Sequence, residues 1–357
     1  MNLRLWVLRT YSRSIPTLAL LAASALAAAQ AATGTTVLPA TATIGPLTVF
    51  HPTAATAVPT KRGPFTVNIA ADGAPQRGNG RLVVISHGSG ASAWVYNDLA
   101  QHLVANGFIV AISEHAGDNW HDHSKIGPRS WKLRPLEVSR AIDAISQDAR
   151  FAPLVDTQRV GVWGMSAGGH TALALAGGRW SPARLMAHCE AHLADEFAAC
   201  TGAATTLKGD GWDGIKKMIA MPLIRWHLRD DEALYGHTDA RIQAIVSGVP
   251  MAADFDPATL AKPLVPLGLI QAGQDLWLVP KFHSGAVIAA CTACEVLASL
   301  PTAGHGALLA PLPPDNPPRI QRLLADPPGF NRAELPDLYE RISGFFQKHL
   351  LADNPKP

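Results

Sequence analysis

A serine flanked by small residues is the clearest chemical signal in the sequence. Residues 164–168 read Gly-Met-Ser-Ala-Gly, which matches the pattern G-x-S-x-G. In that pattern the serine occupies a sharp, strained turn between a strand and a helix, where larger neighbouring side chains would collide. The context fits, because the apolar run 160–163 precedes the turn and the apolar segment 167–176 follows it. The pattern therefore predicts that Ser166 is a nucleophile.

A serine hydroxyl attacks well only when a base accepts its proton, so the chain should also supply a histidine and an acid. His305 lies between two glycines in a loop after the strand-like run 295–300, and Asp275 follows the run 267–272. The chain order serine, aspartate, histidine is typical of α/β-hydrolases. We therefore predict a catalytic triad of Ser166, Asp275 and His305.

The acid of this triad has two alternatives. Asp254 and Asp256 follow the strand-like run 242–246, and some hydrolases of this fold place the acid after that strand. Asp275 is the first choice because it follows the strand at which the usual pattern places the acid.

The oxyanion of an acyl-transfer transition state needs hydrogen-bond donors. One donor is expected from the backbone N–H of Ala167, directly after the nucleophile. The other is expected from the turn 86–90, which reads Ser-His-Gly-Ser-Gly. The N–H of Ser89 is the first choice and that of Gly88 the second, because glycines let the backbone approach a substrate closely. The side chain of His87 is expected to brace this turn.

Apolar runs that alternate with helical patterns must position these residues. Short runs predict strands at 65–69, 81–86, 108–113, 159–163, 242–246, 267–272 and 295–300. Apolar residues at helical spacing predict helices at 94–106, 135–148, 167–176 and 334–350, with Pro135 near the start of the second. Strands that are buried on both faces and separated by helices form a mostly parallel sheet. The predicted fold class is therefore α/β, with the α/β-hydrolase arrangement of helices on both faces of a central sheet.

Two segments depart from this alternation within or before a domain expected to span 65–357. Residues 30–64 are rich in Thr, Ala and Pro and show no helical period, which indicates an N-terminal arm. Residues 179–241 are much longer than an ordinary connection between strands. We expect a helical insertion after the nucleophile helix that covers the top of the sheet; the alternative is a peripheral excursion without contact to substrate.

The N-terminus has the features of an export signal. Arg4, Arg9 and Arg13 precede an apolar stretch over 17–29, which is too short to cross a bilayer as a helix. Small residues then fit cleavage after residue 29 or as late as residue 32. We expect residues 1–29 to be a signal peptide and the mature protein to be secreted into the periplasm, without stable membrane insertion; the alternative is an uncleaved anchor.

Export bears on the four cysteines, because an even number in an oxidising compartment favours disulfides. Proximity in sequence pairs Cys189 with Cys200 and Cys291 with Cys294. The second pair could instead be a redox motif or half of a zinc site. A zinc site would need two more ligands at suitable spacing, and a redox motif usually opens a helix, so disulfides are the first choice.

The charge balance and the remaining motifs exclude several function classes. Lys and Arg number 30 against 28 Asp and Glu, so the chain lacks the basic excess of a nucleic-acid binder. No dinucleotide or ATP motif occurs, and no cofactor is expected. His115, Asp118, His121, Asp122 and His123 share one loop, but no fourth ligand is placed by spacing, so we predict a solvated, hydrogen-bonded loop at the rim of the site and no metal. The oligomeric state is not indicated.

Four motifs together resemble the bacterial group of predicted dienelactone hydrolases, which is related to platelet-activating-factor acetylhydrolases. The motifs are residues 86–90, 114–119, 164–170 and 303–305, and the resemblance runs from about 65 to 350, including Cys189, Cys200 and the segment 326–332. It implies an α/β-hydrolase with a serine–aspartate–histidine triad at Ser166, Asp275 and His305. True dienelactone hydrolases use a cysteine nucleophile, so the serine here does not carry over their lactone specificity.

The sequence therefore predicts a serine hydrolase that cleaves carboxylic esters of small molecules. By family analogy the acyl chains should be short, and charges in 179–241 were expected to interrupt any continuous apolar face, so no lipid interface should be needed. The alternatives are a peptidase or amidase of the same fold and a catalytically silent binding module.

Overall fold

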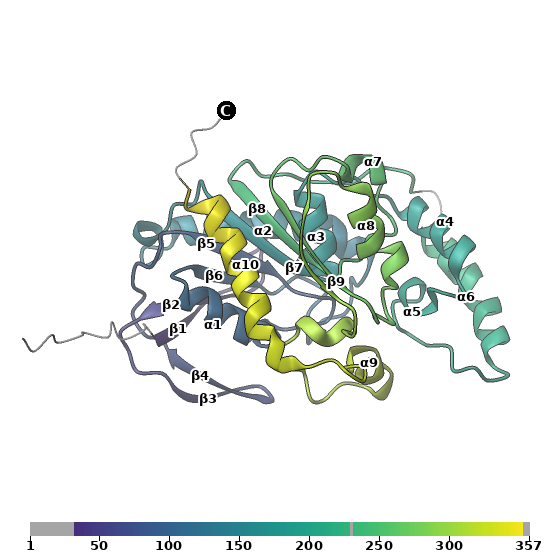
Figure 1. Cartoon of the computed structure of the whole chain (residues 1–357), viewed down its shortest axis with the longest axis horizontal. Helices are drawn as coiled ribbons and strands as arrows, with labels where there is room; N and C mark the ends of the chain where they lie inside the picture. Colours follow the sequence, from purple (N-terminus) through teal and green to yellow (C-terminus); the bar gives the residue numbers. More distant parts are fainter. Residues whose placement is uncertain (1–31, 229–230, 353–357) are drawn as a thin grey trace, which may run out of the picture. The chain divides into compact units, whose positions relative to one another are not determined.

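A ten-stranded sheet forms the centre of the protein in the computed structural model, which describes residues 32–228 and 231–352. Its strand order is β10-β9-β8-β7-β5-β6-β2-β1-β4-β3 (Figure 1). The strands are β1 (Ala32–Leu38), β2 (Leu47–Thr53), β3 (Val58–Arg62), β4 (Phe65–Ala71), β5 (Leu82–Ser86), β6 (Ile109–Ser113), β7 (Val160–Met165), β8 (Ile242–Gly248), β9 (Leu267–Ala272) and β10 (Glu295–Leu300). The signal peptide expected over 1–29 lies outside the described residues.

The half of the sheet from β6 to β10 is parallel, as the alternation of strands and helices predicts. β5, β6 and β7 are buried at every position. Strands covered on both faces are continuous apolar runs, which is why the sequence shows them so clearly. All seven strands expected from 65 onward are present.

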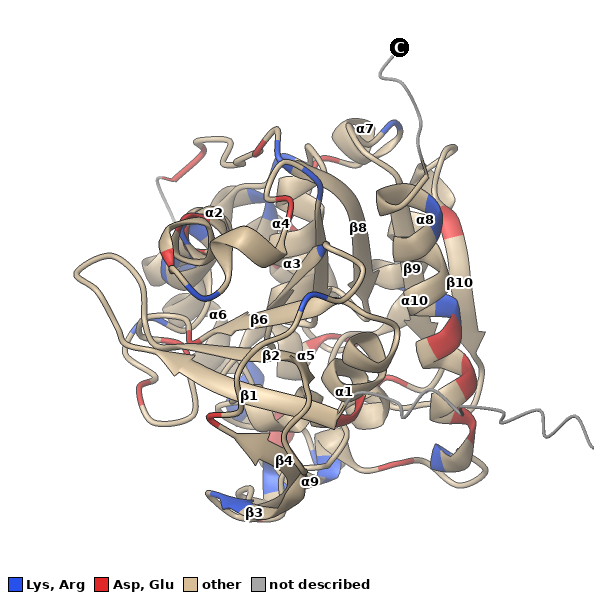
Figure 2. Cartoon of the chain, turned by 90° about the vertical axis from the view of Figure 1, so that its left-hand side faces the viewer, with Lys and Arg blue, Asp and Glu red and all other residues tan. Residues whose placement is uncertain are grey.

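Helices cover both faces of this sheet. The longer ones are α1 (Asn97–Ala105), α2 (Pro128–Gln147), α3 (Ala167–Leu175) and α10 (Leu335–Leu350), and the shorter ones outside the insertion are α7 (Pro257–Leu260), α8 (Ser284–Ala290) and α9 (Pro318–Leu324). Single 3₁₀ turns lie at Ala93–Tyr96, Ala152–Leu154, Pro280–Phe282, His305–Leu308 and Arg332–Glu334. Figure 2 shows α2 and α3 on one side of β6, β2 and β1, with α1 and α10 on the other, and each pair packs into a separate apolar core.

The segment expected to be an N-terminal arm is instead part of the sheet. β2 pairs antiparallel with β6, and β1 pairs antiparallel with β2 and parallel with β4. The expectation rested on the lack of a helical period. β2 is nearly all buried, so it shows no alternation either, and its Thr, Val and Phe residues favour a strand by propensity alone.

The second predicted helix begins seven residues earlier than expected. α2 starts at Pro128, and Pro135 lies inside it rather than near its start. Proline suits the first turn of a helix, where its missing N–H has no intrahelical partner. Pro128 and Pro135 could each fill that place, and the expected start was based on the later proline.

The insertion between α3 and β8 is helical, as expected. It contains α4 (Pro182–His192), α5 (Phe197–Cys200) and α6 (Asp213–Leu228), which lie together at one end of the molecule (Figure 1). α4 and α5 are joined by the disulfide Cys189–Cys200. The second disulfide, Cys291–Cys294, precedes β10, so both expected pairings are confirmed.

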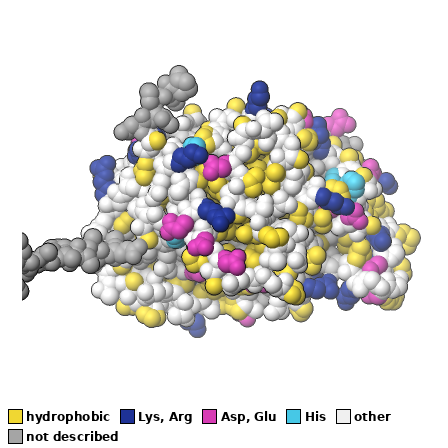
Figure 3. Space-filling view, viewed as in Figure 1, with side chains coloured by type: hydrophobic (Ala, Val, Ile, Leu, Met, Phe, Trp, Pro, Cys, Tyr) yellow, Lys and Arg dark blue, Asp and Glu magenta, His cyan; other side chains and the backbone are white. Residues whose placement is uncertain are grey.

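The surface carries charges of both signs. On the described part of the face shown in Figure 3, acidic and basic side chains are scattered among uncharged ones, and no basic patch gathers. Among the described helices, none combines the length and hydrophobicity needed to cross a bilayer.

Candidate active site

Ser166 lies at the sharp turn between β7 and α3, where the G-x-S-x-G pattern predicts it. Its backbone has φ 58° and ψ −118°, a conformation that side-chain-bearing residues rarely adopt. The turn is tight enough to require glycine nearby: a Cβ on Gly168 would lie 1.8 Å from the carbonyl oxygen of Ser86. The fold therefore holds Ser166 in a strained backbone, as such turns at functional sites often do.

The structure brings Ser166, His305 and Asp275 together from three separate loops. His305 Nε2 lies 3.0 Å from Ser166 Oγ, and His305 Nδ1 lies 2.7 Å from Asp275 Oδ2. Asp275 also accepts hydrogen bonds of 2.8 Å from the backbone N–H groups of Trp277 and Leu278. This geometry fixes the carboxylate, and the carboxylate in turn orients the imidazole toward the serine.

The two alternative acids lie elsewhere. Asp254 is fully buried 3.0 Å from His170, and Asp256 caps α7 through the N–H of Ala258. Neither carboxylate contacts His305, so the geometry selects Asp275.

The register of β5 and β7 places the turn after β5 beside Ser166. Ser86 pairs with Gly164 across β5 and β7, and a Cβ on Gly88 would lie 3.5 Å from that of Ser166. The N–H of Gly88 already donates to Tyr96 Oη at 2.8 Å. Within 32–228 and 231–352, no protein acceptor takes up the N–H of Ser89 or of Ala167. Ser89 is therefore the better of the two predicted donors in this turn.

A buried ion pair holds the turn 86–90, and this pair was not predicted from the sequence. Asp118 and Arg134 are fully buried with 2.9 Å between carboxylate and guanidinium. Asp118 Oδ1 accepts from Ser89 Oγ at 2.6 Å and from the N–H of Gly90 at 3.0 Å. Arg134 also donates to the carbonyl oxygen of His87. Arg134 lies just before the predicted helix 135–148, and nothing in its sequence context signals such a partner.

The histidines of this region form a second support. His115 is fully buried, with Nδ1 2.6 Å from Glu137 and Nε2 2.8 Å from Ser86 Oγ. His87 Nε2 accepts the N–H of His115, which leaves Nδ1 to donate to the carbonyl oxygen of Gly88 at 2.7 Å. The side chain of His87 thus braces the turn.

The loop 115–123 has the side chains of a metal site but not the arrangement. His115 and Asp118 are fully buried against Glu137 and Arg134, so this part of the loop is not solvated as expected, and His121 lies against Glu114 at the surface. No three metal-ligating side chains come together anywhere in the described part of the chain.

Electrostatics keep the ion pair charged. Burial alone would raise the pKa of Asp118, but Arg134 and the hydroxyls of Ser89 and Ser130 outweigh burial and hold that pKa well below its usual range. Burial lowers the pKa of His87 and His115, assisted by the positive charge of Arg134. Both histidines are therefore neutral at pH 7, consistent with their roles as hydrogen-bonding braces.

A cavity of about 750 Å³ opens beside Ser166. Trp131 from α2, Trp277 from the loop after β9, and several apolar residues of α6 form its walls. Its polar lining includes Ser89, Thr201, Thr205, Lys216 and His227. The insertion is thus a wall of the site and not a peripheral excursion.

α6 also presents a continuous apolar face to solvent, contrary to expectation. Large apolar side chains are exposed along the helix at Ile215, Met218, Ile219, Leu223 and Trp226, and just before it at Trp212. These positions recur at helical spacing, so they share one side of the helix. Asp213 and Lys217 lie on the opposite side, and Lys216 and Arg225 border the apolar face. Ile219 and Leu223 are more than half exposed and also line the cavity. The expectation rested on the number of charges along the segment and not on their positions around the helix. That the protein needs no lipid interface stays a prediction.

Comparisons with known proteins agree with this architecture. Residues 55–126 match the family model of platelet-activating factor acetylhydrolase, isoform II. No curated protein matches the chain. A ferulic acid esterase from Streptomyces cinnamoneus aligns with 93% of this chain and 96% of its own, at 17% identity and a TM-score of 0.56. At that identity the match shows the fold alone, and the sheet order and the turn at Ser166 agree with an α/β-hydrolase fold.

Proposed function

We propose that the protein is a serine hydrolase of carboxylic esters. The observation that carries the proposal is the hydrogen-bonded series Ser166–His305–Asp275 at a strained turn. Beside it lie the N–H groups of Ala167 and Ser89, for which the described part of the chain provides no acceptor. A nucleophile within reach of a base, with that base oriented by a third group, is the arrangement that acyl transfer requires. The partial match to acetylhydrolases supports an ester as substrate.

In the proposed reaction, Ser166 Oγ attacks the ester carbonyl as His305 Nε2 accepts its proton. The oxyanion accepts hydrogen bonds from the N–H groups of Ala167 and Ser89. His305 then gives the proton to the leaving alcohol, which departs and leaves an acyl-enzyme. Asp275 holds the proton on Nδ1 and stabilises the imidazolium. A water molecule deprotonated by His305 cleaves the acyl-enzyme and restores the serine.

The cavity supports an uncharged, largely apolar substrate. Lys216 is the one Lys or Arg among its lining residues, and Asp213 engages its ammonium at 2.7 Å. Cavities of 300–1,000 Å³ suit ligands of roughly drug size, well above an acetyl or butyryl group. The expected range of acyl groups was two to six carbons. We therefore extend it to include longer and aromatic acyl groups.

A p-nitrophenyl ester series tests the proposal. The purified protein should hydrolyse the esters, and kcat/KM should rise beyond hexanoate. Ser166→Ala should keep the fold and lose the activity. A silent binding module would show no wild-type hydrolysis, and an amidase would prefer matched anilides. If kcat/KM declined beyond butyrate, the preference for short acyl chains would be restored, and the longer range inferred from the cavity volume would be refuted.

We also propose that the protein is exported to an oxidising compartment such as the periplasm. Support comes from the two disulfides, which use all four cysteines of the chain. Fractionation of cells that express the full chain, with the N-terminus of the product sequenced, tests this proposal.

A further inference from the structure

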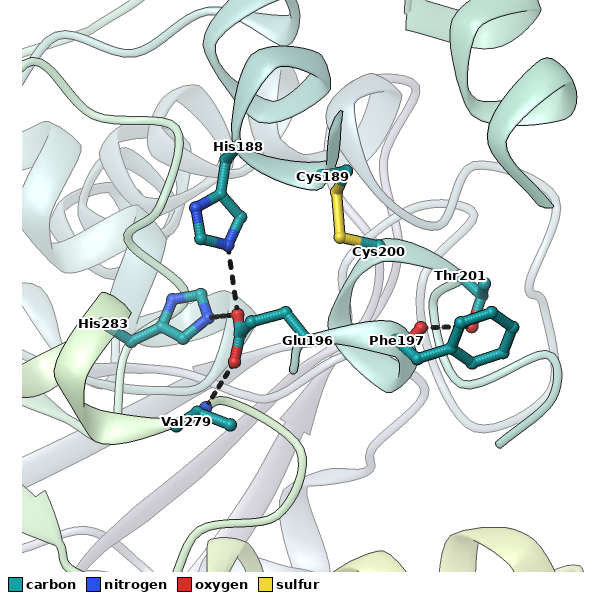
Figure 4. Close-up of a disulfide and its surroundings, with 8 residues drawn as sticks. All are labelled: His188, Cys189, Glu196, Phe197, Cys200, Thr201, Val279 and His283. Carbon is teal, nitrogen blue, oxygen red and sulfur yellow. Dashed lines mark hydrogen bonds and ion pairs between the residues drawn. A yellow bond between two sulfur atoms is a disulfide. The ribbon is translucent and has the colours of Figure 1, made fainter. Parts of the chain in front are cut away.

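A buried carboxylate in the insertion lies outside the triad but contacts the loop that carries its acid. Glu196 lies between the paired cysteines Cys189 and Cys200, and only 1% of its surface is exposed. Figure 4 shows its side chain pointing away from the disulfide, toward Val279 and His283. Burying a carboxylate is costly unless it is well partnered, so its partners indicate what it holds in place.

Both oxygens of Glu196 are occupied. Oε1 accepts the N–H of Val279 at 2.8 Å, and Oε2 lies 2.6 Å from His283 Nε2 and 3.3 Å from His188 Nε2. Burial would raise the pKa of Glu196, but the two histidines and the Val279 N–H outweigh it and lower the pKa to about 2. The carboxylate is therefore ionised and acts as an acceptor on both oxygens.

The first contact continues the fixation of the acid loop. Asp275 accepts the N–H groups of Trp277 and Leu278, and Glu196 accepts the next one, from Val279. Three consecutive backbone donors are thus held by two carboxylates. The Trp277 ring, which lies tilted against the His305 ring at a centroid distance of 5.1 Å, belongs to this same segment.

The second contact leads to the nucleophile. His283 Nδ1 accepts the N–H of Ala252 at 3.0 Å, so its Nε2 carries the proton that it donates to Glu196. The residue before Ala252 is Met251, whose N–H donates to the carbonyl oxygen of Ser166 at 3.1 Å. The same carboxylate therefore reaches the segment that holds the backbone of Ser166.

We propose that Glu196 is a positioning residue. It holds the loop 275–279, which carries Asp275, in a fixed position relative to the turn that carries Ser166. The proposal rests on the proposed esterase function. Glu196 touches neither substrate nor triad; it acts through Val279 and through His283. The disulfide joins α4 to α5 on either side of Glu196 and so limits where the carboxylate can move. Displacing reacting groups by about 1 Å can cost 100-fold in rate, so the effect should fall on kcat.

The test compares Glu196→Ala and Glu196→Gln with Glu190→Ala, all in the full chain. Glu190 is an exposed residue of the same insertion that pairs with Arg225, and it is the matched control. We expect Glu196→Ala to lower kcat by about 10- to 100-fold with KM changed by less than about threefold. Gln Oε1 can accept the Val279 N–H, but its NH2 group then faces His283 Nε2 and cannot accept from it, so Glu196→Gln should fall between Ala and wild type. Glu190→Ala should match wild type.

Folding is checked by circular dichroism at the assay temperature. A folded Glu196→Ala protein with wild-type kcat would overturn the proposal. Failure of both Glu196 variants to fold would also overturn it, in favour of a purely structural role. Failure of the esterase proposal itself looks different, because the wild-type protein would then hydrolyse no ester.

Discussion

Replacing Arg134 by methionine should destabilise the protein strongly, because it leaves the Asp118 carboxylate buried without its counter-charge. Both side chains are fully buried. Breaking such a pair by removing one partner costs about 3–5 kcal/mol. Asp118 keeps its bonds from Ser89, Gly90 and Ser130, so the lower end of that range applies. A loss of about 3 kcal/mol is large against the ~5–15 kcal/mol stability of a typical protein.

The assay is urea unfolding at pH 7, followed by circular dichroism and tryptophan fluorescence. Arg140→Met, on the same helix, is the control: its guanidinium donates to the carbonyl oxygen of Thr43 at an exposed position, and it should lose less than about 1 kcal/mol. Adding Asp118→Asn to Arg134→Met should recover part of the loss, because no unpaired charge then remains. A loss below about 1 kcal/mol for Arg134→Met, or no recovery in the double variant, would refute this reasoning.

The pH dependence has a defined sign. The folded-state pKa of Asp118 is depressed, so its contribution is complete above the unfolded value of about 3.9 and is lost as pH falls toward the folded value. Below pH 3.9 the wild-type advantage over Arg134→Met should shrink by up to about 1.4 kcal/mol per pH unit, because the two folded states differ by at most one proton on Asp118. A constant difference between pH 7 and pH 3 would contradict the assignment.

Three further outcomes follow from the site and the disulfides. Single and combined replacements of Ser166, His305 and Asp275 should lower kcat non-additively, since the three act as a unit; additive losses in single, double and triple variants would contradict that. Thiol titration of the denatured, unreduced protein should find no free thiol, and two or more per chain would defeat the pairing. Ile224→Trp should fill the cavity and shift the p-nitrophenyl ester preference toward shorter acyl chains, whereas Met218→Trp, on the exposed face of α6, should not.

The contacts among Ser166, His305 and Asp275 could be predicted because their signals are local and ordered along the chain. Small residues mark the turn at Ser166, and Asp275 and His305 each follow a recognisable buried strand. In a parallel sheet the carboxyl ends of such strands lie along one edge, so chain order already implies proximity. The same argument placed the turn 86–90 beside Ser166, which the register of β5 and β7 then bears out.

Features that depend on distant partners could not be predicted. Arg134 meets Asp118 across 16 positions, and Glu196 meets His283 across 87, without any periodic pattern that links them. The exposed face of α6 escaped notice because exposure depends on what packs against a helix, which composition does not record. β1 and β2 were missed because their residues are mostly buried and therefore show no alternation, although the composition of β2 favours a strand.

Buried carboxylates recur around this site for a common physical reason. Loops after parallel strands lack ladder partners, yet the backbone N–H groups that face this site are partly or fully buried and need acceptors. Asp118 accepts the N–H of Gly90, and Asp275 accepts the N–H groups of residues 277 and 278. Glu196 accepts the N–H of Val279. An ionised acceptor forms stronger hydrogen bonds than a neutral one and cannot act as a competing donor. Charged side chains from distant elements thus give these loops the rigidity that a preorganised site needs, at places where secondary structure cannot supply it.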